Sequence, residues 1–517
     1  MGLLRRWSPT LLIALVVIDI AVGTVLRFMT TSKLWLDEAQ SVNIASKPLG
    51  DLTHWLRLDG APPLYYVLLH FWMGVFGSSD AAVRAMSGVF AVLAIGAAYG
   101  AARRWLGHSD ALLAAATLAV LPYAIYFGTE TRMYSLVMLE AGVIIWILKI
   151  HLERPRWLSA GAIALVGALM LYTHYWSIYL LGVIGLFGII HWWLHRHEER
   201  GNRNWLLVGG VATSFVLFLP WVPIFNEQRQ HTGTPWAPAP TAYQFFTWFQ
   251  GFTVNQSIPH IVASLHTQLT LMFFVALVLF GVFGLAMRTD SPMIQLSPTG
   301  ESRTRTIAFI VFATMAAGLL ASNISGSAYV PRYAAVIAIP VCMLLARGVT
   351  NLNTSLRILI VFGLFSAASL WTDRWGVGTQ RTQAGEIAVA LESAPSDSLV
   401  YVCPDQLGPS LLRYSNPELT YIGYPRFEKP FIVNWYDYLA AYDKRTPALN
   451  AQIQALRVAP GQPVYMVRAP FYGIKNTCLE FEYHLAQDLN RRIKTIVVNR
   501  IGDFYQSMEL DELVATK

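Results

Sequence analysis

Two adjacent carboxylates are the first residues in this chain whose types and placement suggest chemistry. Asp37 and Glu38 lie in the stretch KLWLDEAQS, residues 33–41, directly after the first long apolar segment. Charged side chains near a bilayer are costly and tend to mark a site or a pathway. An acidic pair at the lipid–water boundary suits general-base or metal-binding work on a substrate presented from the membrane. The simpler interpretation is a polar loop that ends a helix, and the rest of the chain must decide between the two.

The composition is that of a membrane protein. Of the 517 residues, 55% are hydrophobic and 13% are charged, and the mean hydropathy is +0.43. Soluble domains are usually about a quarter charged. The length accommodates about ten membrane spans and one soluble domain. The formal net charge of +7 is modest, and no nucleic-acid partner is predicted.

The cysteines and the N-terminus limit the interpretation further. Three cysteines provide neither a zinc site nor a disulfide framework. Cys342 lies in an apolar segment, which leaves Cys403 and Cys478 to form a single disulfide if the C-terminal part faces an oxidising compartment. Arg5 and Arg6 precede the first apolar run and no small-residue cleavage site stands out, so we expect that run to be a retained helix.

Hydropathy predicts about eleven spans. Residues 62–77 (PPLYYVLLHFWMGVFG) are short for a span, and we expect them to lie in the interface. The other apolar segments are residues 9–29, 81–101, 111–127, 135–150, 157–172, 178–194, 205–225, 269–287, 307–321, 334–345 and 358–370. This arrangement concentrates Lys and Arg in the loops on the side of the N-terminus, as the positive-inside rule requires. If residues 62–77 spanned, that bias would largely collapse, so the acidic pair and the C-terminus are predicted to face outward.

From about residue 372 the composition becomes that of a soluble domain. A helix-like run at residues 383–391 precedes strand candidates at 399–403, 419–422, 464–467 and 493–498. Alternation of strands and helices indicates a small α/β domain. The predicted fold class is therefore a polytopic α-helical membrane domain, residues 1–371, with a C-terminal α/β domain, residues 372–517, on the outer face. Residues 30–80 form the outward loop, with interfacial helices and the acidic pair.

Several polar side chains collect on the outer side under this topology. Besides the acidic pair, they are His54, Asp59, Arg84, Arg132, Tyr134, His174, Arg332 and Tyr333. Arginines that face carboxylates suit an anionic ligand with a phosphate. A sugar phosphate needs fixed positive charge as the phosphate departs, and the attacking hydroxyl needs a base. One carboxylate and several arginines supply both, and a lipid donor would place its polyprenyl tail between helices.

The order of the motifs carries a resemblance. They are the outward Asp37-Glu38, PPLYY at 62–66, Phe76-Gly77-x-x-Asp80-x-x-x-Arg84, Glu130-x-Arg132-x-Tyr134 and a late Arg332-Tyr333. Together they resemble the bacterial polyprenyl-phosphate-dependent glycosyltransferases of the GT-C fold, which are related to protein O-mannosyltransferases and lipid A aminoarabinose transferases. The likeness covers about the first 200 residues in motifs and the rest in architecture.

The resemblance implies roles for the acidic pair and the arginines. Asp37 would be the general base for the acceptor, and Glu38 would support it or help to hold a metal. Donor phosphate binding would fall to three arginines, Arg84, Arg132 and Arg332. Many relatives have His or Lys before the first proline of the Pro-Pro segment, whereas this chain has Ala61, which puts a divalent metal in doubt. No other cofactor is implied.

The remaining candidates have simpler explanations beside the functional one. Five further residues on the outer side are candidates for substrate binding, namely Tyr134, His54, Asp59, His174 and Tyr333. Aromatic side chains at helix ends also form interfacial belts, histidines are commonly hydrogen-bonded structural residues, and arginines at helix ends also extend to lipid headgroups.

The predicted function is sugar transfer from a polyprenyl-phosphate donor to a hydroxyl of a lipid, a glycan or, less favoured, a protein. The enzyme would lie in a bacterial cytoplasmic membrane, with its site facing outward and with inversion at the anomeric carbon. One alternative is a transporter or flippase of a lipid-linked sugar, which calls for mid-membrane polar residues and repeats with broken helices. The other is a non-catalytic assembly subunit.

Overall fold

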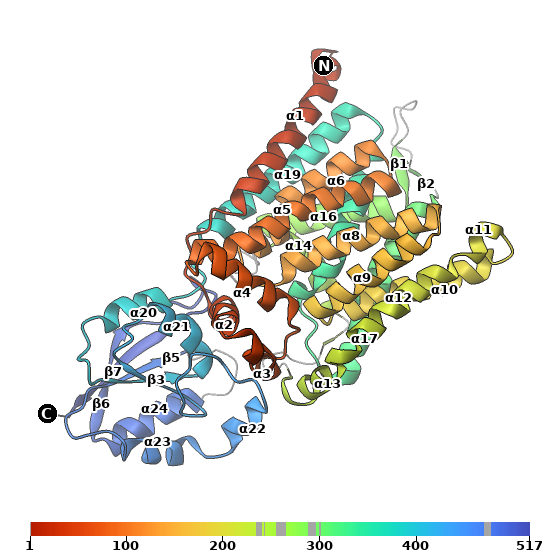
Figure 1. The fold of residues 1–517 in the computed structure, drawn as a ribbon. Coiled ribbons are helices and arrows are strands. Elements are labelled where there is room, and N and C mark those ends of the chain that lie inside the picture. The colour runs from red at the N-terminus through yellow and green to blue at the C-terminus, as the bar shows by residue number, and fades with distance from the viewer. Residues whose placement is uncertain are drawn as a thin grey trace.

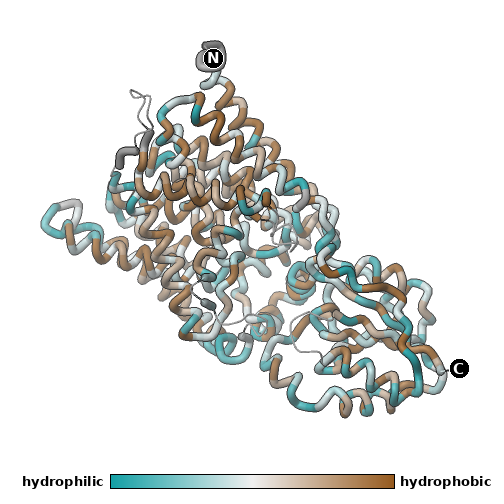
Figure 2. The backbone as a smooth tube through the Cα atoms, turned by 180° about the vertical axis from the view of Figure 1, so that it is seen from behind, coloured by the Kyte–Doolittle hydropathy of each residue, from teal (hydrophilic) through white to brown (hydrophobic). Residues whose placement is uncertain are grey.

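The protein consists of a large helical bundle and a smaller α/β domain (Figure 1). The structure is a computed structural model that describes residues 2–233, 240–241, 243–254, 265–287, 296–298, 301–469 and 477–516. Hydrophobic residues dominate the bundle, whereas hydrophilic residues are spread through the α/β domain (Figure 2). This architecture confirms the predicted fold class.

Nine helices among the described residues are long and apolar enough to cross a membrane. They are α1 (Gly2–Leu26), α5 (Asp80–Trp105), α8 (Tyr134–Glu153), α10 (Ser177–His195), α12 (Trp205–Phe218) continued by η2 (Leu219–Trp221) and α13 (Val222–His231), α16 (Leu265–Val282), α17 (Ser302–Ser325), η3 (Pro331–Ile337) continued by α18 (Ala338–Thr350), and α19 (Ser355–Gly378). A bent pair, α6 (His108–Val120) and α7 (Pro122–Gly128), brings the number to ten. The eleventh predicted segment is α9 (Trp157–Thr173), a shorter apolar helix that packs against α8 and α12.

The bend between α6 and α7 is stabilised by a buried arginine. It measures 57° and follows from Pro122, which has no N–H to offer the carbonyl one turn earlier. Arg27, at the end of α1, donates to the carbonyl oxygens of Leu118 and Ala119, both at 2.7 Å. The bend is therefore fixed, and α7 leads into residues 129–133, the loop that carries Arg132.

Glycines bring α16 and α18 into close contact. A Cβ on Gly281 would lie 2.0 Å from the carbonyl oxygen of Leu344, and one on Gly348 would lie 1.9 Å from that of Leu277. Neither position has room for any side chain, so the backbones pack directly against each other. This packing fixes the helix whose first turn, η3, carries Arg332.

Short helices connect α1 to α5. They are α2 (Leu36–Ala45), η1 (Leu49–Asp51), α3 (Leu52–Asp59) and α4 (Leu64–Phe76). The 13 residues of α4 extend about 20 Å, which is less than the hydrocarbon thickness of about 30 Å. The rest of the described bundle consists of α11 (Glu199–Asn202), α14 (Gln244–Thr253) and the antiparallel strands β1 (Leu285–Met287) and β2 (Leu296–Pro298).

The α/β domain is built on a five-stranded sheet in the order β4-β3-β5-β7-β6. The strands are β3 (Leu399–Cys403), β4 (Thr420–Gly423), β5 (Val464–Arg468), β6 (Arg491–Val497) and β7 (Glu509–Ala515). β3 pairs in parallel with β4 and β5, and Val400 lies opposite Tyr421 and Tyr465. β7 pairs antiparallel with β5 and β6. The four predicted strands correspond to β3, β4, β5 and β6. Hydropathy misses β7 because three of its seven residues are acidic.

Helices cover both faces of this sheet. They are α20 (Ala384–Leu391), η4 (Asp405–Leu407), α21 (Gly408–Tyr414), α22 (Tyr438–Asp443), α23 (Pro447–Ala455) and α24 (Thr477–Asp488). Side chains of β3 alternate between two cores, because Tyr401 packs with Phe481 of α24 whereas Val400 packs with Ile387 of α20 and Leu411 of α21. This is the layered α/β arrangement that the sequence predicts.

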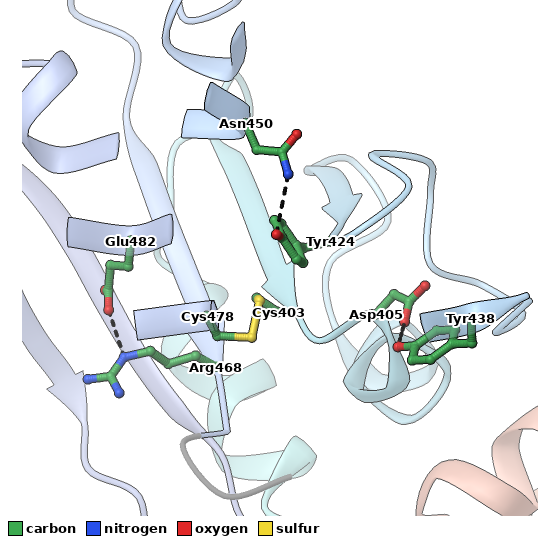
Figure 3. The surroundings of a disulfide bond; sticks show 8 residues. All are labelled: Cys403, Asp405, Tyr424, Tyr438, Asn450, Arg468, Cys478 and Glu482. Atoms are coloured by element: carbon green, nitrogen blue, oxygen red, sulfur yellow. Dashed lines mark hydrogen bonds and ion pairs between the residues drawn. A yellow bond between two sulfur atoms is a disulfide. The ribbon is translucent and has the colours of Figure 1, made fainter. Parts of the chain in front are cut away.

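A disulfide joins β3 to α24 (Figure 3). It links Cys403, the last residue of β3, to Cys478 near the start of α24 across 75 positions of sequence. Cys342 is free and buried in α18. The predicted pairing is confirmed.

Candidate active site

Helix α2 presents one carboxylate to a cavity and buries the rest of its surface. Of its ten residues, only Asp37 is not buried. Its carboxylate, 18% exposed, lines a cavity of about 560 Å³ whose lining comes from the bundle and from Trp435 of the α/β domain. A cavity of this size fits a ligand with the dimensions of a sugar phosphate.

Seven of the ten predicted site residues line this cavity. They are Asp37, Asp59, Arg132, Tyr134, His174, Arg332 and Tyr333. They come from α2, α3, the loop before α8, the first residue of α8, the loop after α9, and η3, most of which are far apart in sequence. The structure therefore brings together most of the outward polar residues that the topology placed on one side.

Asp37 lies between two arginines. Nη1 of Arg332 donates to Oδ2 of Asp37 at 2.9 Å, and Nη2 of Arg132 lies 3.8 Å from the same oxygen. Arg132 also donates to the hydroxyl groups of Ser41, at 3.2 Å, and Tyr66, at 3.4 Å. The cavity wall thus has one carboxylate whose charge is balanced by two guanidinium groups that a ligand can reach.

Glu38 faces away from the cavity into a buried ion pair. Its two oxygens accept from Nε and Nη2 of Arg84, at 2.7 and 2.6 Å, and Oε1 also accepts from the backbone N–H of Thr131 at 3.0 Å. Burial opposes ionisation, but the charges of Arg84 and Arg381 and the hydrogen bonds from Arg84 and Thr131 together hold the pKa of Glu38 below its usual value. Both oxygens are engaged, so Glu38 does not fit the role of a metal ligand.

Arg84 and His54 do not lie where the sequence analysis expected them. Arg84 is 4% exposed, and besides Glu38 it donates to the carbonyl oxygens of Ser32 and Lys33. Its guanidinium is used entirely within the protein and does not line the cavity. His54 is exposed on α3, where it packs edge-on against Trp55. Neither residue belongs to the cavity wall.

His174 is held as a neutral imidazole. Its Nδ1 accepts from the backbone N–H of Trp176 at 3.1 Å, which assigns the proton to Nε2. Burial, together with the charges of Arg132 and Arg332, lowers the pKa of His174 to about 3. The ring packs against Tyr134 and Tyr333, at centroid distances of 5.7 and 5.2 Å. It can donate one hydrogen bond but does not add positive charge.

The sequence analysis missed Arg381, which the α/β domain contributes beneath the site. It is 1% exposed, lies 3.6 Å from Glu38, and donates to the carbonyl oxygen and hydroxyl of Thr129 at 3.0 and 2.6 Å. Its guanidinium also lies over the ring of Tyr126. Arg381 lies well beyond the predicted span at residues 358–370, so its position in the sequence gave no sign of this contact.

The α/β domain also caps α2. Trp35, the residue before the helix, gives no side-chain cap, and the N–H of Leu36 donates instead to Oε1 of Gln506 at 3.2 Å. The N–H of Leu34 donates to the hydroxyl of Tyr414 at 2.7 Å. The Trp35 indole packs edge-on against Tyr505 at 4.8 Å. The position of the acidic pair therefore depends on both domains.

Glu130 lies beside this junction, and its ionisation should make the stability of the protein depend on pH. Its Oε1 accepts from the Trp35 indole at 2.9 Å, and burial raises the pKa of Glu130 from 4.5 to about 7. Between these values the folded chain holds a proton that the unfolded chain has released. Stability therefore falls as the pH rises through this window, by about 3 kcal/mol in total.

Glu130→Gln keeps an acceptor for Trp35 and removes the titration. We expect its thermal unfolding midpoint, relative to wild type, to increase steadily from about pH 5 to about pH 7 and then level off. Unfolding scans of both proteins at several pH values test this. A difference that is constant with pH would show that Glu130 does not titrate in this range.

Comparisons with known proteins bear on the fold. A family model described as dolichyl-phosphate-mannose-protein mannosyltransferase matches residues 60–224. The crystal structure of ArnT from Cupriavidus metallidurans bound to undecaprenyl phosphate superposes with a TM-score of 0.57 at 16% identity, covering 97% of this chain and 98% of that chain.

A second likeness is to the Archaeoglobus fulgidus oligosaccharyltransferase in complex with Zn and sulfate, with a TM-score of 0.51 at 13% identity, covering 80% of this chain and 62% of that one. No curated protein sequence matches the chain. At these identities the structural likeness establishes the fold. The chain therefore has the GT-C fold of these membrane glycosyltransferases, which confirms the resemblance predicted from its motifs.

Proposed function

We propose that this protein transfers a sugar from a polyprenyl-phosphate-linked donor to a hydroxyl of a lipid, glycan or protein acceptor. The observation that carries the proposal is the placement of Asp37 between Arg332 and Arg132 on the cavity wall. Two structures of similar fold support it. One is ArnT bound to undecaprenyl phosphate, and the other is the oligosaccharyltransferase AglB from Archaeoglobus fulgidus in complex with an inhibitory peptide and a dolichol-phosphate, which has a TM-score of 0.50 at 12% identity and covers 88% of this chain and 69% of that chain.

The chemistry divides between the carboxylate and the arginines. The donor phosphate binds Arg132 and Arg332 and competes with Asp37 for them, which frees Oδ2 to accept a proton. The acceptor hydroxyl gives its proton to Asp37 as its oxygen bonds to the anomeric carbon. The bond from that carbon to the phosphate oxygen breaks, and the electron pair stays on the phosphate, where the guanidinium groups stabilise it. Direct displacement of this kind inverts the anomeric configuration.

Glu38, Arg84 and Arg381 act as positioning residues in this scheme. They connect α2, the start of α5 and the α/β domain through the contacts described above. The described residues contain no group of three or more histidine, cysteine or carboxylate side chains arranged to hold a metal. With Glu38 engaged by Arg84, the donor set at the cavity does not fit a divalent ion, and no step is assigned to one.

The ends of the helices support a site on the outer face of the membrane. α8 begins at the cavity with Tyr134, and Lys149 lies near its other end; α5 begins beside α2, and its last turn carries Arg103 and Arg104. η3, which carries Arg332 in its first turn, continues into α18, and the last turn of α18 carries Arg347. Lys and Arg accumulate at cytoplasmic helix ends, so the cavity and the disulfide-containing α/β domain belong on the opposite side. A disulfide persists in an oxidising compartment, which supports the same orientation.

The proposal is tested by sugar transfer in lipid nanodiscs. Purified protein is given a panel of radiolabelled polyprenyl-phosphate sugars together with lipid and glycan extracts. We expect one donor to be consumed, with its sugar recovered on an extract component in the inverted configuration. No transfer from any donor would contradict the proposal, and retention of configuration would contradict direct displacement.

A further inference from the structure

One segment of the α/β domain lies against three helices of the bundle at the cavity. We call residues 433–437 the strap. Val433 exchanges two hydrogen bonds with the side chain of Gln40 in α2, at 2.8 and 3.0 Å. The N–H of Trp435 donates to the carbonyl oxygen of Leu58 in α3 at 2.9 Å.

The far end of the strap binds α13. The N–H of Asp437 donates to the carbonyl oxygen of His231 at 2.8 Å, and Nδ1 of His231 lies 3.0 Å from Oδ1 of Asp437. The ring of His231 stacks on that of Tyr436, with centroids 4.3 Å apart and planes 7° from parallel. The strap is therefore held at both ends and in its middle, and it is a fixed part of the cavity wall.

Trp435 is the strap residue that faces the cavity. Its side chain lines the cavity and is half-buried. Its indole packs against Tyr438 at a centroid distance of 5.0 Å, and the Tyr438 hydroxyl is bound in turn to Asp405 (Figure 3). Within the described part of the chain, the indole N–H has no hydrogen-bond acceptor. The ring is thus supported by the domain and remains available to a ligand.

The cavity has two chemically different sides. Toward α10 and α17 its lining is largely apolar and includes Ile178, Tyr179, Ala321 and Ile324. Beside the strap the lining includes Gln40, Asp59, Gly60, Thr232 and Trp435. The first side suits the hydrocarbon of a lipid donor, and the second side suits a group that is both polar and flat.

Asp59 can still accept hydrogen bonds on the strap side. Its oxygens accept from Nε2 of Gln40 at 3.0 Å and from the hydroxyl of Tyr66 at 2.8 Å. A carboxylate has about four acceptor positions, so two remain for ligand hydroxyls. Gln40 uses both of its amide hydrogens on Val433 and Asp59 and serves as a brace between them.

We propose that Trp435 and Asp59 form a binding site for a pyranose ring. The apolar C–H face of the sugar stacks on the indole, and its hydroxyl groups donate to Asp59 and accept from the indole N–H. Trp435 is then a specificity-determining residue that the α/β domain supplies. This inference rests on the proposed function. The ring can come from the donor or from the acceptor, because both would carry the same chemistry.

Binding of free sugars tests the site without knowledge of the substrates. Saturation-transfer-difference NMR is recorded with the full-length protein in nanodiscs and a panel of neutral, amino and acidic methyl pyranosides. We expect wild type to saturate the protons of one ring face of at least one glycoside. Trp435→Leu, which keeps an apolar side chain against Tyr438 but has no ring, should bind about tenfold more weakly, whereas Trp435→Phe should retain most of the binding.

The matched control is Tyr483→Ala, which removes an aromatic residue that is 54% exposed on α24 in the same domain. It should bind glycosides as wild type does. Absence of glycoside binding by wild type, or equal binding by wild type and Trp435→Leu, overturns the proposal. A lower unfolding midpoint of Trp435→Leu with unchanged binding would show that Trp435 only packs the interface.

Transfer kinetics then distinguish the two sources of the ring. In Trp435→Leu, a KM raised for the donor alone assigns the ring to the donor, and a KM raised for the acceptor alone assigns it to the acceptor. Transfer with both constants unchanged overturns the sugar site but leaves the proposed function standing. Glycoside binding that depends on Trp435, in a protein that transfers no sugar, supports the site and rejects the proposed function.

Discussion

Glu38→Ala is expected to lower the free energy of unfolding by about 3–5 kcal/mol, because removing one member of a buried ion pair leaves the other charge uncompensated. Two guanidinium groups would lose their partner, since Arg84 lies 2.6 Å and Arg381 lies 3.6 Å from the Glu38 carboxylate. All three side chains are buried. Thermal unfolding in detergent, followed by intrinsic fluorescence, measures the effect.

The control for this prediction is an exposed ion pair of the same types. Glu227 lies 3.6 Å from Arg57, and both side chains are more than a third exposed, Glu227 at 35% and Arg57 at 46%. Glu227→Ala should therefore change the stability by at most about 1 kcal/mol. Equal shifts in the two variants would show that burial of Glu38 does not matter to stability.

Acid should weaken the contribution that Glu38 makes to the stability of the protein. The pKa of Glu38 is lowered in the folded state, so its stabilising effect is present above the ordinary pKa of a glutamate and is lost as the pH falls. Glu130 has the opposite dependence, because its pKa is raised. The two carboxylates therefore act in different pH windows, Glu130 between 4.5 and about 7 and Glu38 below 4.5, and each variant should change only its own part of the profile.

Arg332→Ala and Arg132→Ala are expected to lower kcat/KM for the donor by about 100- to 1,000-fold each, the loss typical of removing one donor that stabilises developing negative charge. Arg332 lies closer to Asp37 than Arg132 does, at 2.9 Å against 3.8 Å. Lysine at either position keeps the positive charge but cannot donate two hydrogen bonds to the phosphate in the bidentate geometry of arginine, so it should recover activity only in part. Initial rates over a range of donor concentrations measure both effects.

Arg57→Ala provides the comparison, because Arg57 is a half-exposed arginine of α3 that does not line the cavity. Its kinetics should match those of wild type. If Arg57→Ala lost as much activity as the cavity variants, the effect would reflect the general charge of this face and not phosphate binding. Unchanged kinetics in Arg132→Ala and Arg332→Ala would remove both residues from the proposed chemistry.

Hydropathy and order of motifs were sufficient for the membrane fold. Long apolar segments separated by basic loops determine where helices lie, because a bilayer leaves few alternatives for the backbone. Hydropathy also predicted the α/β domain, because its strands β3, β4 and β5 are short apolar runs. β7 was not, because its acidic residues are accommodated by cross-strand partners such as Arg468, which hydropathy does not register.

The candidate site was predictable in part. Asp37, Arg132 and Arg332 could be named because each follows or begins a span on the predicted outer side. The burial of Arg84 against Glu38 could not be predicted, because an arginine at a helix start is equally suited to headgroups, ligand or partner until its neighbours are known. Arg381 and Trp435 depend on how the α/β domain docks on α2 and α3, a tertiary contact that leaves no local pattern in the sequence.

The proposed role of Asp37 as the base in a sugar transfer is tested by measuring Asp37→Asn in the transfer assay. Asparagine keeps the size of the side chain and cannot take up the acceptor's proton, so the rate should fall by about 100-fold or more. Wild type and variant must first show equal folded abundance and equal unfolding midpoints. Loss of transfer with the fold intact is the predicted result, and equal rates in the two proteins would contradict the assignment of Asp37 as the base.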